Sequence, residues 1–282
     1  MEEANKEINE VKNKTYCIII PVYKEDISEL EKISIKSLYK ETNNYEHTYL
    51  ICPKGLNTTV YQSIFPAIKK LEFPVTFFKS KFTYSHLLMQ YEFYNVFSVY
   101  DYMFIFQLDG YMFKNEIQKW INKDIDYVGA PVFAPKSQEW LLGQYGIKNP
   151  WVGNGGVSLR KIKTFKYICD PNAKFRVVNT LSDEVLLKML YGEDVYFCNI
   201  VPELYGFKIN RANWGEALEF SWDLWDYSVD IEELLKKANV HIDPMCCHGW
   251  NISKRALRYW KNRINEITDE LIDNSNLQEF YF

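Results

Sequence analysis

An apolar run that ends in a single acid is the first stretch of this chain whose residue types could do chemistry. Residues 102–106 read Tyr-Met-Phe-Ile-Phe, and Gln107 and Asp109 follow where such a strand should end. The run predicts a buried strand. Ligands of open α/β sheets bind beyond the carboxyl ends of the strands, so Asp109 could hold a divalent cation, which prefers oxygen ligands. Asp109-Gly110 is also a common turn pair, and this stretch alone leaves both interpretations open.

Four later features carry polar groups that could act with Asp109. Residues 153–156 read Gly-Asn-Gly-Gly, so the backbone there either passes close to another group or simply turns. Glu193 and Asp194 open a helical turn, where two acids are stabilised by the helix dipole; helix capping is therefore the alternative to catalysis. His248 is either a ligand or a satisfied structural histidine. Arg160 could pair with a phosphate or be solvated.

Alternating strand and helix patterns surround these residues. In the first half, strands are predicted at 16–23, 48–53, 74–78 and 102–106, and helices after Ser28, at 59–70 and at 84–100. Ser28 and Glu31 have the spacing of a capping box. This alternation indicates a mostly parallel sheet with helical crossovers.

The second half is predicted to be less regular. Its expected helices are 115–121, 161–167, 182–190 and 253–271, with a helical turn at 192–197; its expected strands are 126–131, 157–159 and 207–212. The long loop at 132–150 is of the kind that often binds ligands. The segment 214–227 is dense in Trp and acids, as an acceptor-binding surface would be.

Composition narrows the class of protein. The chain has 282 residues, of which 47% are hydrophobic and 17% aromatic, enough for a large core and for an aromatic-lined cleft. A net charge of −4 without a long basic run argues against nucleic acid as the main partner. No apolar run is long enough to span a membrane, and the charged N-terminus predicts no signal segment. We therefore expect the cytoplasm, with peripheral association at the inner face of the membrane left open, and all six cysteines reduced.

The order of these motifs resembles that of the GT-A family of glycosyltransferases. Residues 20–23, Ile-Pro-Val-Tyr, are similar to the opening strand of that fold, whose end contacts the nucleotide. Residues 107–109, Gln-Leu-Asp, occupy the position of the D-x-D motif, with Gln in place of the first acid. Residues 193–196, Glu-Asp-Val-Tyr, resemble a motif of inverting β-1,3-galactosyl- and N-acetylglucosaminyltransferases. Residues 248–250, His-Gly-Trp, resemble the late histidine motif that completes the metal site in many members.

A closer resemblance covers about residues 15–255. It is to a bacterial family of unknown function that is grouped with these transferases, and it is carried by Gln-Leu-Asp, Tyr-Val-Gly-Ala-Pro, Val-Gly-Asn-Gly-Gly-x-Ser-Leu-Arg, Glu-Asp-Val-Tyr-Phe and His-Gly-Trp. The combination is specific, whereas each piece alone is weak.

The resemblance implies a single α/β domain with a GT-A-like, Rossmann-like and mostly parallel sheet flanked by helices. It implies metal-dependent, inverting transfer of a sugar from a nucleotide-sugar, taken to be a UDP-sugar, to a hydroxyl of a glycan or lipid-linked acceptor in bacterial surface polysaccharide synthesis. Mn²⁺ or Mg²⁺ would be held by Asp109 and His248, whose side chains should then lie within about 6 Å of each other. Asp194 would be the catalytic base. Glu193 would orient the donor sugar or the loop.

The remaining site residues fall into two groups. The donor nucleotide is expected at the end of the first strand and beyond the third, with the base framed by Lys81 and Tyr84. Its predicted contacts are Pro21, Val22, Tyr23, Glu25, Lys81, Tyr84 and Gln107. The predicted sugar or acceptor contacts are Asn154, Gly155, Gly156, Trp214 and Trp250.

We predict one domain with a lead-in at 1–14, a transferase domain at 15–255 and a C-terminal helix and tail at 256–282. Residues 15–113 would bind the nucleotide and residues 114–255 would form the acceptor and catalytic half. A nucleotidyltransferase is a weaker alternative, because no Gly-rich phosphate loop follows the first strand. A non-catalytic carbohydrate-binding or scaffold protein with the same fold remains a second alternative, because Gln107 replaces an expected acid.

Overall fold

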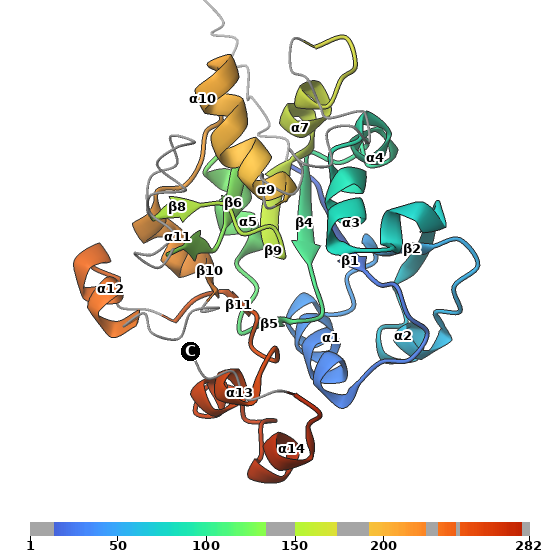
Figure 1. Cartoon of the computed structure of the whole chain (residues 1–282), viewed down its shortest axis with the longest axis vertical. Coiled ribbons are helices and arrows are strands. Elements are labelled where there is room, and N and C mark those ends of the chain that lie inside the picture. Colours follow the sequence, from blue (N-terminus) through green and yellow to red (C-terminus); the bar gives the residue numbers. More distant parts are fainter. Residues whose placement is uncertain (1–13, 134–149, 174–191, 224–230, 241–242, 278–282) are drawn as a thin grey trace, which may run out of the picture.

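A six-stranded sheet forms the centre of the molecule (Figure 1). The computed structural model describes residues 14–133, 150–173, 192–223, 231–240 and 243–277. The strand order is β3-β2-β1-β4-β9-β6, in which β3, β2, β1 and β4 are parallel and β9 is antiparallel to both neighbours. The predicted mostly parallel α/β sheet is confirmed. The strands are β1 (Tyr16–Pro21), β2 (Thr48–Pro53), β3 (Lys69–Phe73), β4 (Tyr102–Phe106), β6 (Tyr127–Gly129) and β9 (Val157–Lys161).

Helices pack on both faces of this sheet and give a three-layer α/β/α arrangement. One face is covered by α1 (Glu29–Thr42), α2 (Thr59–Ile64), α5 (Ile117–Asn122) and α11 (Trp214–Phe220). The other face is covered by α3 (Lys81–Leu88), α4 (Tyr91–Val96) and α7 (Ile162–Ile168), together with the helical segment that contains α9 (Glu193–Val195) and α10 (Val201–Tyr205).

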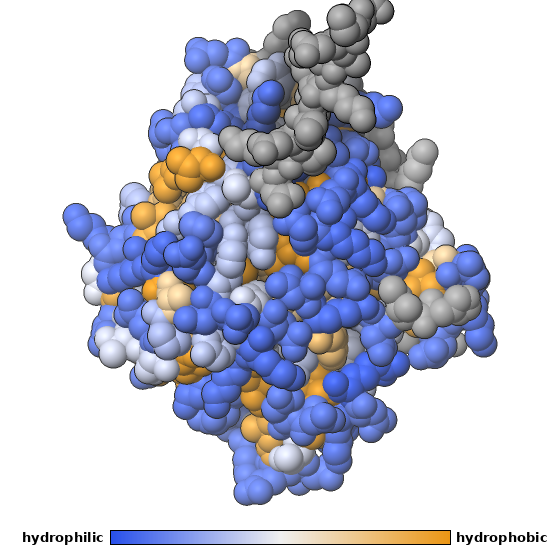
Figure 2. Space-filling view, turned by 180° about the vertical axis from the view of Figure 1, so that it is seen from behind, coloured by the Kyte–Doolittle hydropathy of each residue, from blue (hydrophilic) through white to orange (hydrophobic). Residues whose placement is uncertain are grey.

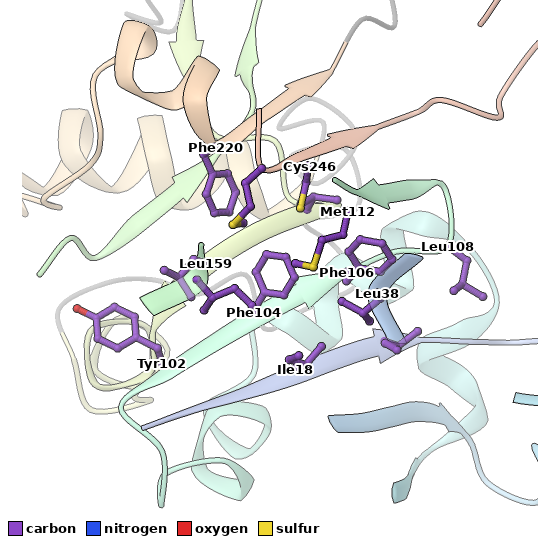
Figure 3. Packing of buried hydrophobic residues seen from close by; sticks show 14 of the residues in the cluster. Ile18, Leu38, Tyr102, Phe104, Phe106, Leu108, Met112, Leu159, Phe220 and Cys246 are labelled. Carbon is purple, nitrogen blue, oxygen red and sulfur yellow. The ribbon is translucent and has the colours of Figure 1, made fainter. Parts of the chain in front are cut away.

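The central strands are apolar along their length because both of their faces are buried. Ile18 and Phe104 lie side by side on β1 and β4 and enter the core under α1, as Figure 3 shows. Their neighbours Ile19 and Ile105 enter the core on the opposite face. All four side chains are completely buried. A strand buried on both faces has no polar alternation, which is why the run before Asp109 was recognisable in the sequence.

A second, three-stranded sheet continues from the end of β4. It has the order β10-β11-β5, with β5 (Gly110–Met112), β10 (Ser221–Asp223) and β11 (Cys246–His248). β5 pairs with β11 so that Gly110 faces His248, and β10 pairs with β11 so that Asp223 faces His248. The small sheet therefore brings three distant segments of the chain together at the end of β4. A further short pair, β7 (Pro131–Val132) and β8 (Trp151–Val152), leads into the glycine-rich turn.

The C-terminal part packs on the small sheet. Trp222, Trp250 and Trp260 are buried in a third apolar cluster with α13 (Lys254–Trp260), and α14 (Asp269–Asn274) follows. In Figure 1 these two helices lie at the lower end of the molecule, and α12 (Ile231–Ala238) lies to one side.

Several predicted elements differ from the structure. The strand predicted at 74–78 is wrong: β3 is Lys69–Phe73, an edge strand whose mostly exposed side chains lack an apolar pattern, and Val75–Phe78 forms a short 3₁₀ turn. The helix predicted at 84–100 is two helices, α3 and α4, and the helix predicted at 253–271 is divided into α13 and α14. Residues 207–212 make only an isolated bridge to Tyr127. The predicted helix 182–190 and most of the loop 132–150 lie outside the described residues.

The surface is mostly polar on one face (Figure 2), and the cysteines lie beneath the surface. Figure 2 shows a face that is mainly hydrophilic, with apolar residues in small separate areas. All six cysteines are buried and unpaired in the structure. Within the described ranges, no helix is both long and apolar enough to cross a membrane.

The predicted capping box of α1 is present and can be tested. The Ser28 hydroxyl accepts the Glu31 backbone N–H at 3.2 Å, and the Glu31 carboxylate accepts the Ser28 N–H at 2.9 Å. Ser28→Ala should lower the free energy of unfolding by about 1 kcal/mol, because one helix N–H loses its acceptor. Ser63→Ala on the exposed side of α2 is the control and should change it little. Equal urea-denaturation midpoints for the two variants would contradict the capping role.

Candidate active site

A cavity of about 550 Å³ lies at the carboxyl ends of β1 and β4. Its walls come from residues 21–24 after β1, residues 78–81 before α3 and residues 107–109 after β4. These are the places where parallel α/β sheets bind ligands, and the volume is that of an ordinary small-molecule site. The strand order explains the position, because β1 and β4 are direct neighbours in the sheet.

The cavity brings together most of the residues that were predicted to contact a nucleotide. Glu25 is the exception, since it does not line the cavity and its carboxylate accepts the Asn57 N–H at 3.2 Å. Lys79 also lines the cavity and was not predicted; its closeness to Lys81 in the sequence was the available signal. The predicted residues that do line the cavity are Pro21, Val22, Tyr23, Lys81, Tyr84 and Gln107.

Asp109 lines this cavity and contacts His248, which is not itself a lining residue. The distance from Asp109 Oδ1 to His248 Nε2 is 3.1 Å, and Gln107 Oε1 lies 3.3 Å from the same nitrogen. Burial raises the pKa of Asp109, but the adjacent imidazolium outweighs it and holds that pKa below its usual value. Burial lowers the pKa of His248, but Asp109 and Asp223 outweigh it and raise that pKa well above its usual value. When no cation is bound between them, Asp109 and His248 therefore form an ion pair.

The atoms around the Asp109–His248 contact suit a divalent cation. Asp109 Oδ1 is enclosed and accepts no hydrogen bond of good geometry from the described residues, although His248 lies beside it. Carboxylate, amide oxygen and imidazole nitrogen are suitable donors for Mn²⁺ or Mg²⁺. The described ranges contain no group of three or more His, Cys, Asp or Glu side chains arranged around a metal position. Phosphate and water oxygens would have to supply the other ligands, as is usual for Mg²⁺ in nucleotide sites.

The glycine-rich turn packs directly against His248. A Cβ atom on Gly156 would come within 2.0 Å of His248 Nε2, so no other residue fits there without moving the ring. The Asn154 side-chain oxygen accepts the Gly156 N–H at 3.0 Å, and the Gln107 N–H donates to the Gly156 carbonyl at 2.9 Å. The Tyr127 hydroxyl donates to the carbonyls of Gly153 and Asn154. Hydrogen bonds with Asn154, Gln107 and Tyr127 therefore fix the turn. Of the two interpretations that the sequence left open, the structure shows the first: the glycine backbone passes close to another group, which is the His248 ring.

Glu193 lies on the other side of the turn, in a buried ion pair. Its carboxylate is 2.8 Å from an Arg160 guanidinium nitrogen and accepts the Ser85 hydroxyl at 2.9 Å. Arg160 is completely buried, and it also donates hydrogen bonds to Ser158, Tyr94 and the Gly155 carbonyl. Arg160 is therefore neither solvated nor exposed to a phosphate, which corrects both sequence-based alternatives.

Asp194 is placed differently from its neighbour Glu193. Its carboxylate accepts the Gly155 N–H at 3.0 Å and the Val195 N–H at 2.8 Å, and it has no cationic partner in the described part of the chain. Burial, together with the negative charge of Glu193, raises the pKa of Asp194 to about 7. A carboxyl group with that pKa can exchange a proton near neutral pH.

Sequence reasoning missed Asp223, whose carboxylate contacts both His248 and Asn154. The only feature of the sequence that pointed to Asp223 was its position in the acid-rich segment 214–227. Trp250 is completely buried and donates its indole N–H to Ser34 and to the Gly110 carbonyl, so it packs the core and cannot stack on a sugar. Trp214 is half-buried beside Phe133, and its predicted acceptor contact stays a prediction.

Comparison with known proteins identifies the fold. The family described as "Protein of unknown function (DUF5672)" matches residues 67–248. No curated protein sequence matches the chain. Among solved structures, the galactosyltransferase LgtC in complex with donor and acceptor sugar analogues is similar, with a TM-score of 0.55 and 13% identity over 90% of this chain and 98% of that one. Mouse xyloside xylosyltransferase 1 is similar with a TM-score of 0.52 and 12% identity, over 83% of this chain and 97% of that one. The chain therefore has the fold of GT-A glycosyltransferases.

The buried ion pair gives a testable stability effect. Arg160→Met should lower the free energy of unfolding by about 3–5 kcal/mol, because it leaves the Glu193 carboxylate buried without a partner. Adding Glu193→Gln should recover part of that loss, since the unpaired charge is then removed. Lys237→Met, which breaks the exposed Lys237–Glu233 pair, is the control and should cost about 0.5 kcal/mol or less. Urea denaturation measures all of these changes. A loss for Arg160→Met no larger than for Lys237→Met would contradict the role given to the pair.

Proposed function

We propose that this chain, which belongs to the DUF5672 family of proteins of unknown function, is a metal-dependent glycosyltransferase. It would transfer a sugar from a nucleotide-sugar, taken to be a UDP-sugar, to a hydroxyl of a glycan or lipid-linked acceptor. The observation that carries the proposal is the contact of His248 with Asp109, which lines a cavity at the carboxyl ends of β1 and β4. The GT-A fold supports it, and the motif resemblance suggests bacterial surface polysaccharide synthesis as the setting.

The cavity suits a nucleoside diphosphate in both size and charge. Tyr23 is a largely exposed aromatic side chain at its rim, where it could cover a base. Lys79 and Lys81 place two exposed positive charges on the same cavity, which would favour phosphate oxygens. The Tyr84 hydroxyl is enclosed and finds no hydrogen-bond partner in the described residues, so it could bind the donor. We therefore place the diphosphate between the lysines and the Asp109–His248 pair.

Asp109 and His248 would hold the cation, with Gln107 beside them. When bound, Mn²⁺ or Mg²⁺ would neutralise the negative charge that develops on the departing diphosphate. Gln107 in place of an acid makes the site less negative than a pair of carboxylates would. Gly156 packs against His248 and leaves room for its ring because it has no side chain.

Asp194 would remove the proton from the acceptor hydroxyl. It has the raised pKa that suits a base near neutral pH, and only the Gly155–Gly156 backbone separates its hydrogen bond from the His248 contact. Glu193 cannot do this, since Arg160 and Ser85 occupy its carboxylate. We assign Glu193 to fixing the segment that carries Asp194, and we propose inversion at the anomeric carbon.

A non-catalytic carbohydrate-binding protein is the second candidate. The observation that favours it is Gln107, which stands beside His248 where an acid would strengthen a metal site. A screen of nucleotide sugars for Mn²⁺-dependent release of the free nucleotide separates the two functions. Binding of the sugars without release under any condition would favour the second candidate.

Removal of the metal should weaken nucleotide binding. If the cation bridges the Asp109–His248 pair and the diphosphate, chelation of Mn²⁺ should raise the UDP dissociation constant by at least about tenfold, which corresponds to roughly 1.4 kcal/mol. Asp109→Asn should have a similar effect even with Mn²⁺ present. Asp273→Asn, which changes an exposed acid on α14, is the control. Calorimetry that finds equal UDP affinity with and without chelator would contradict the bridging role.

Asp194→Asn should slow turnover while leaving donor affinity nearly unchanged. Loss of a general base lowers kcat by about 10²–10⁴-fold, and the lost interaction belongs to the transition state. The base must be ionised, so with a pKa of about 7 the wild-type kcat should rise with pH and level off above neutrality. Steady-state kinetics across this pH range measures both effects.

Three results would change the assignment of Asp194. Near-normal turnover of Asp194→Asn together with inactivity of a folded Glu193→Gln variant would reverse the two roles. A wild-type kcat that does not vary with pH around neutrality would remove the titrating base. A product that keeps the anomeric configuration of the donor, as read by NMR, would rule out inversion.

A further inference from the structure

The unpredicted acid Asp223 lies where two parts of the proposed site meet. It is the last residue of β10 and is paired across the small sheet with His248. Its side chain is buried, with 9% of the residue exposed. One carboxylate oxygen, Oδ2, lies 3.3 Å from His248 Nδ1 and accepts a hydrogen bond from the Asn154 side-chain amide at 2.5 Å. A single atom therefore contacts both His248 and the glycine-rich turn.

The contact with His248 decides which ring nitrogen faces the cavity residues. Nδ1 points to Asp223, whereas Nε2 points to Asp109 and Gln107. A carboxylate that accepts the Nδ1 proton fixes the ring orientation and leaves Nε2 free to bind a metal. It also makes Nε2 a stronger donor of its electron pair.

The contact with Asn154 continues toward Asp194. The Asn154 amide nitrogen donates to Asp223, while its oxygen accepts the Gly156 N–H. Both ends of the amide are thus used, which fixes the turn. The next residue, Gly155, donates its N–H to the Asp194 carboxylate at 3.0 Å. An unbroken path of hydrogen bonds and one short backbone segment therefore runs from His248 to Asp194.

We propose that Asp223 is a positioning residue that orients His248 for the cation and ties it to the turn that holds Asp194. This inference rests on the proposed function, because it concerns the same site. It adds that one residue, Asp223, fixes both the proposed cation ligand His248 and, through Asn154, the turn that holds the proposed base Asp194. Asp223 would act through His248 and Asn154, without touching the sugar or the nucleotide.

The test uses Mn²⁺ binding, which needs no substrate. Free Mn²⁺ is measured by its electron paramagnetic resonance signal as the full-length protein is titrated. Asp223→Ala should weaken Mn²⁺ binding by about 10–100-fold, the usual effect of losing a carboxylate behind a ligating histidine. Asp223→Asn keeps the size and the acceptor oxygen but loses the charge, so its loss should be smaller, about fivefold to tenfold.

Asn154→Ala is the matched control for the other contact. It leaves the Asp223–His248 contact in place, so Mn²⁺ affinity should stay within about twofold of wild type, while kcat at saturating Mn²⁺ should fall because the turn is released. Under the same saturating conditions, adding Asn154→Ala to Asp223→Ala should lower kcat little further, since both changes break the same connection.

The outcomes separate this inference from the proposed function. If wild type binds Mn²⁺ and folded Asp223→Asn and Asp223→Ala bind it within about twofold of wild type, the positioning role is wrong and the proposed function stands. If Asp223→Ala does not fold, Asp223→Asn alone decides by the same criterion. Fully additive kcat losses in the double variant would contradict the shared anchor. If wild type itself does not bind Mn²⁺, the metal-dependent function fails, and this inference fails with it.

Discussion

The site depends on one geometric constraint: the backbone at Gly155 and Gly156 must pass between two groups of charged side chains. Asp109, His248 and Asp223 lie on one side, and Glu193, Asp194 and Arg160 lie on the other. A Cβ atom on Gly156 would overlap the His248 ring, and one on Gly155 would come within 2.7 Å of the Glu193 carboxylate. Only a segment without side chains can therefore hold both groups at this separation. The fixed turn lets strands from both sheets contribute to one small volume.

The two groups differ in how their charges are satisfied. Glu193 and Arg160 neutralise each other in the core, so they hold the segment in place and leave no charge for a substrate. Asp194 has no such partner and keeps a pKa of about 7, above its ordinary value of 3.8. Between these pH values the folded protein holds a proton that the unfolded chain has released. The contribution of Asp194 to stability therefore falls as pH rises from about 4 to 7.

The sequence predicted the parts of this arrangement that are governed by local patterns. The buried strand before Asp109 and the Ser28 capping box were recognisable because each follows from a short-range rule. The edge strand Lys69–Phe73 was missed, since its exposed side chains leave no apolar signal. Trp250 was taken for a ligand contact, although its indole N–H donates to Ser34 and Gly110, which lie 216 and 140 residues away in the sequence. The contacts of Asp223 with His248 and of Arg160 with Glu193 were out of reach because they join residues that are 25 and 33 positions apart in the sequence. The first contact depends on the pairing of β10 with β11.

A crystal structure of the protein with Mn²⁺ and UDP, recorded with anomalous scattering from manganese, would show whether Asp109 and His248 hold the cation. We expect one anomalous peak between Asp109 and His248, at roughly 2.0–2.6 Å from its ligand atoms. We also expect the diphosphate of UDP to complete the coordination, with the rest of the nucleotide in the cavity beside Tyr23. UDP bound in the cavity with Asp109 and His248 still in direct contact, and with no manganese between them, would contradict this role of the two residues.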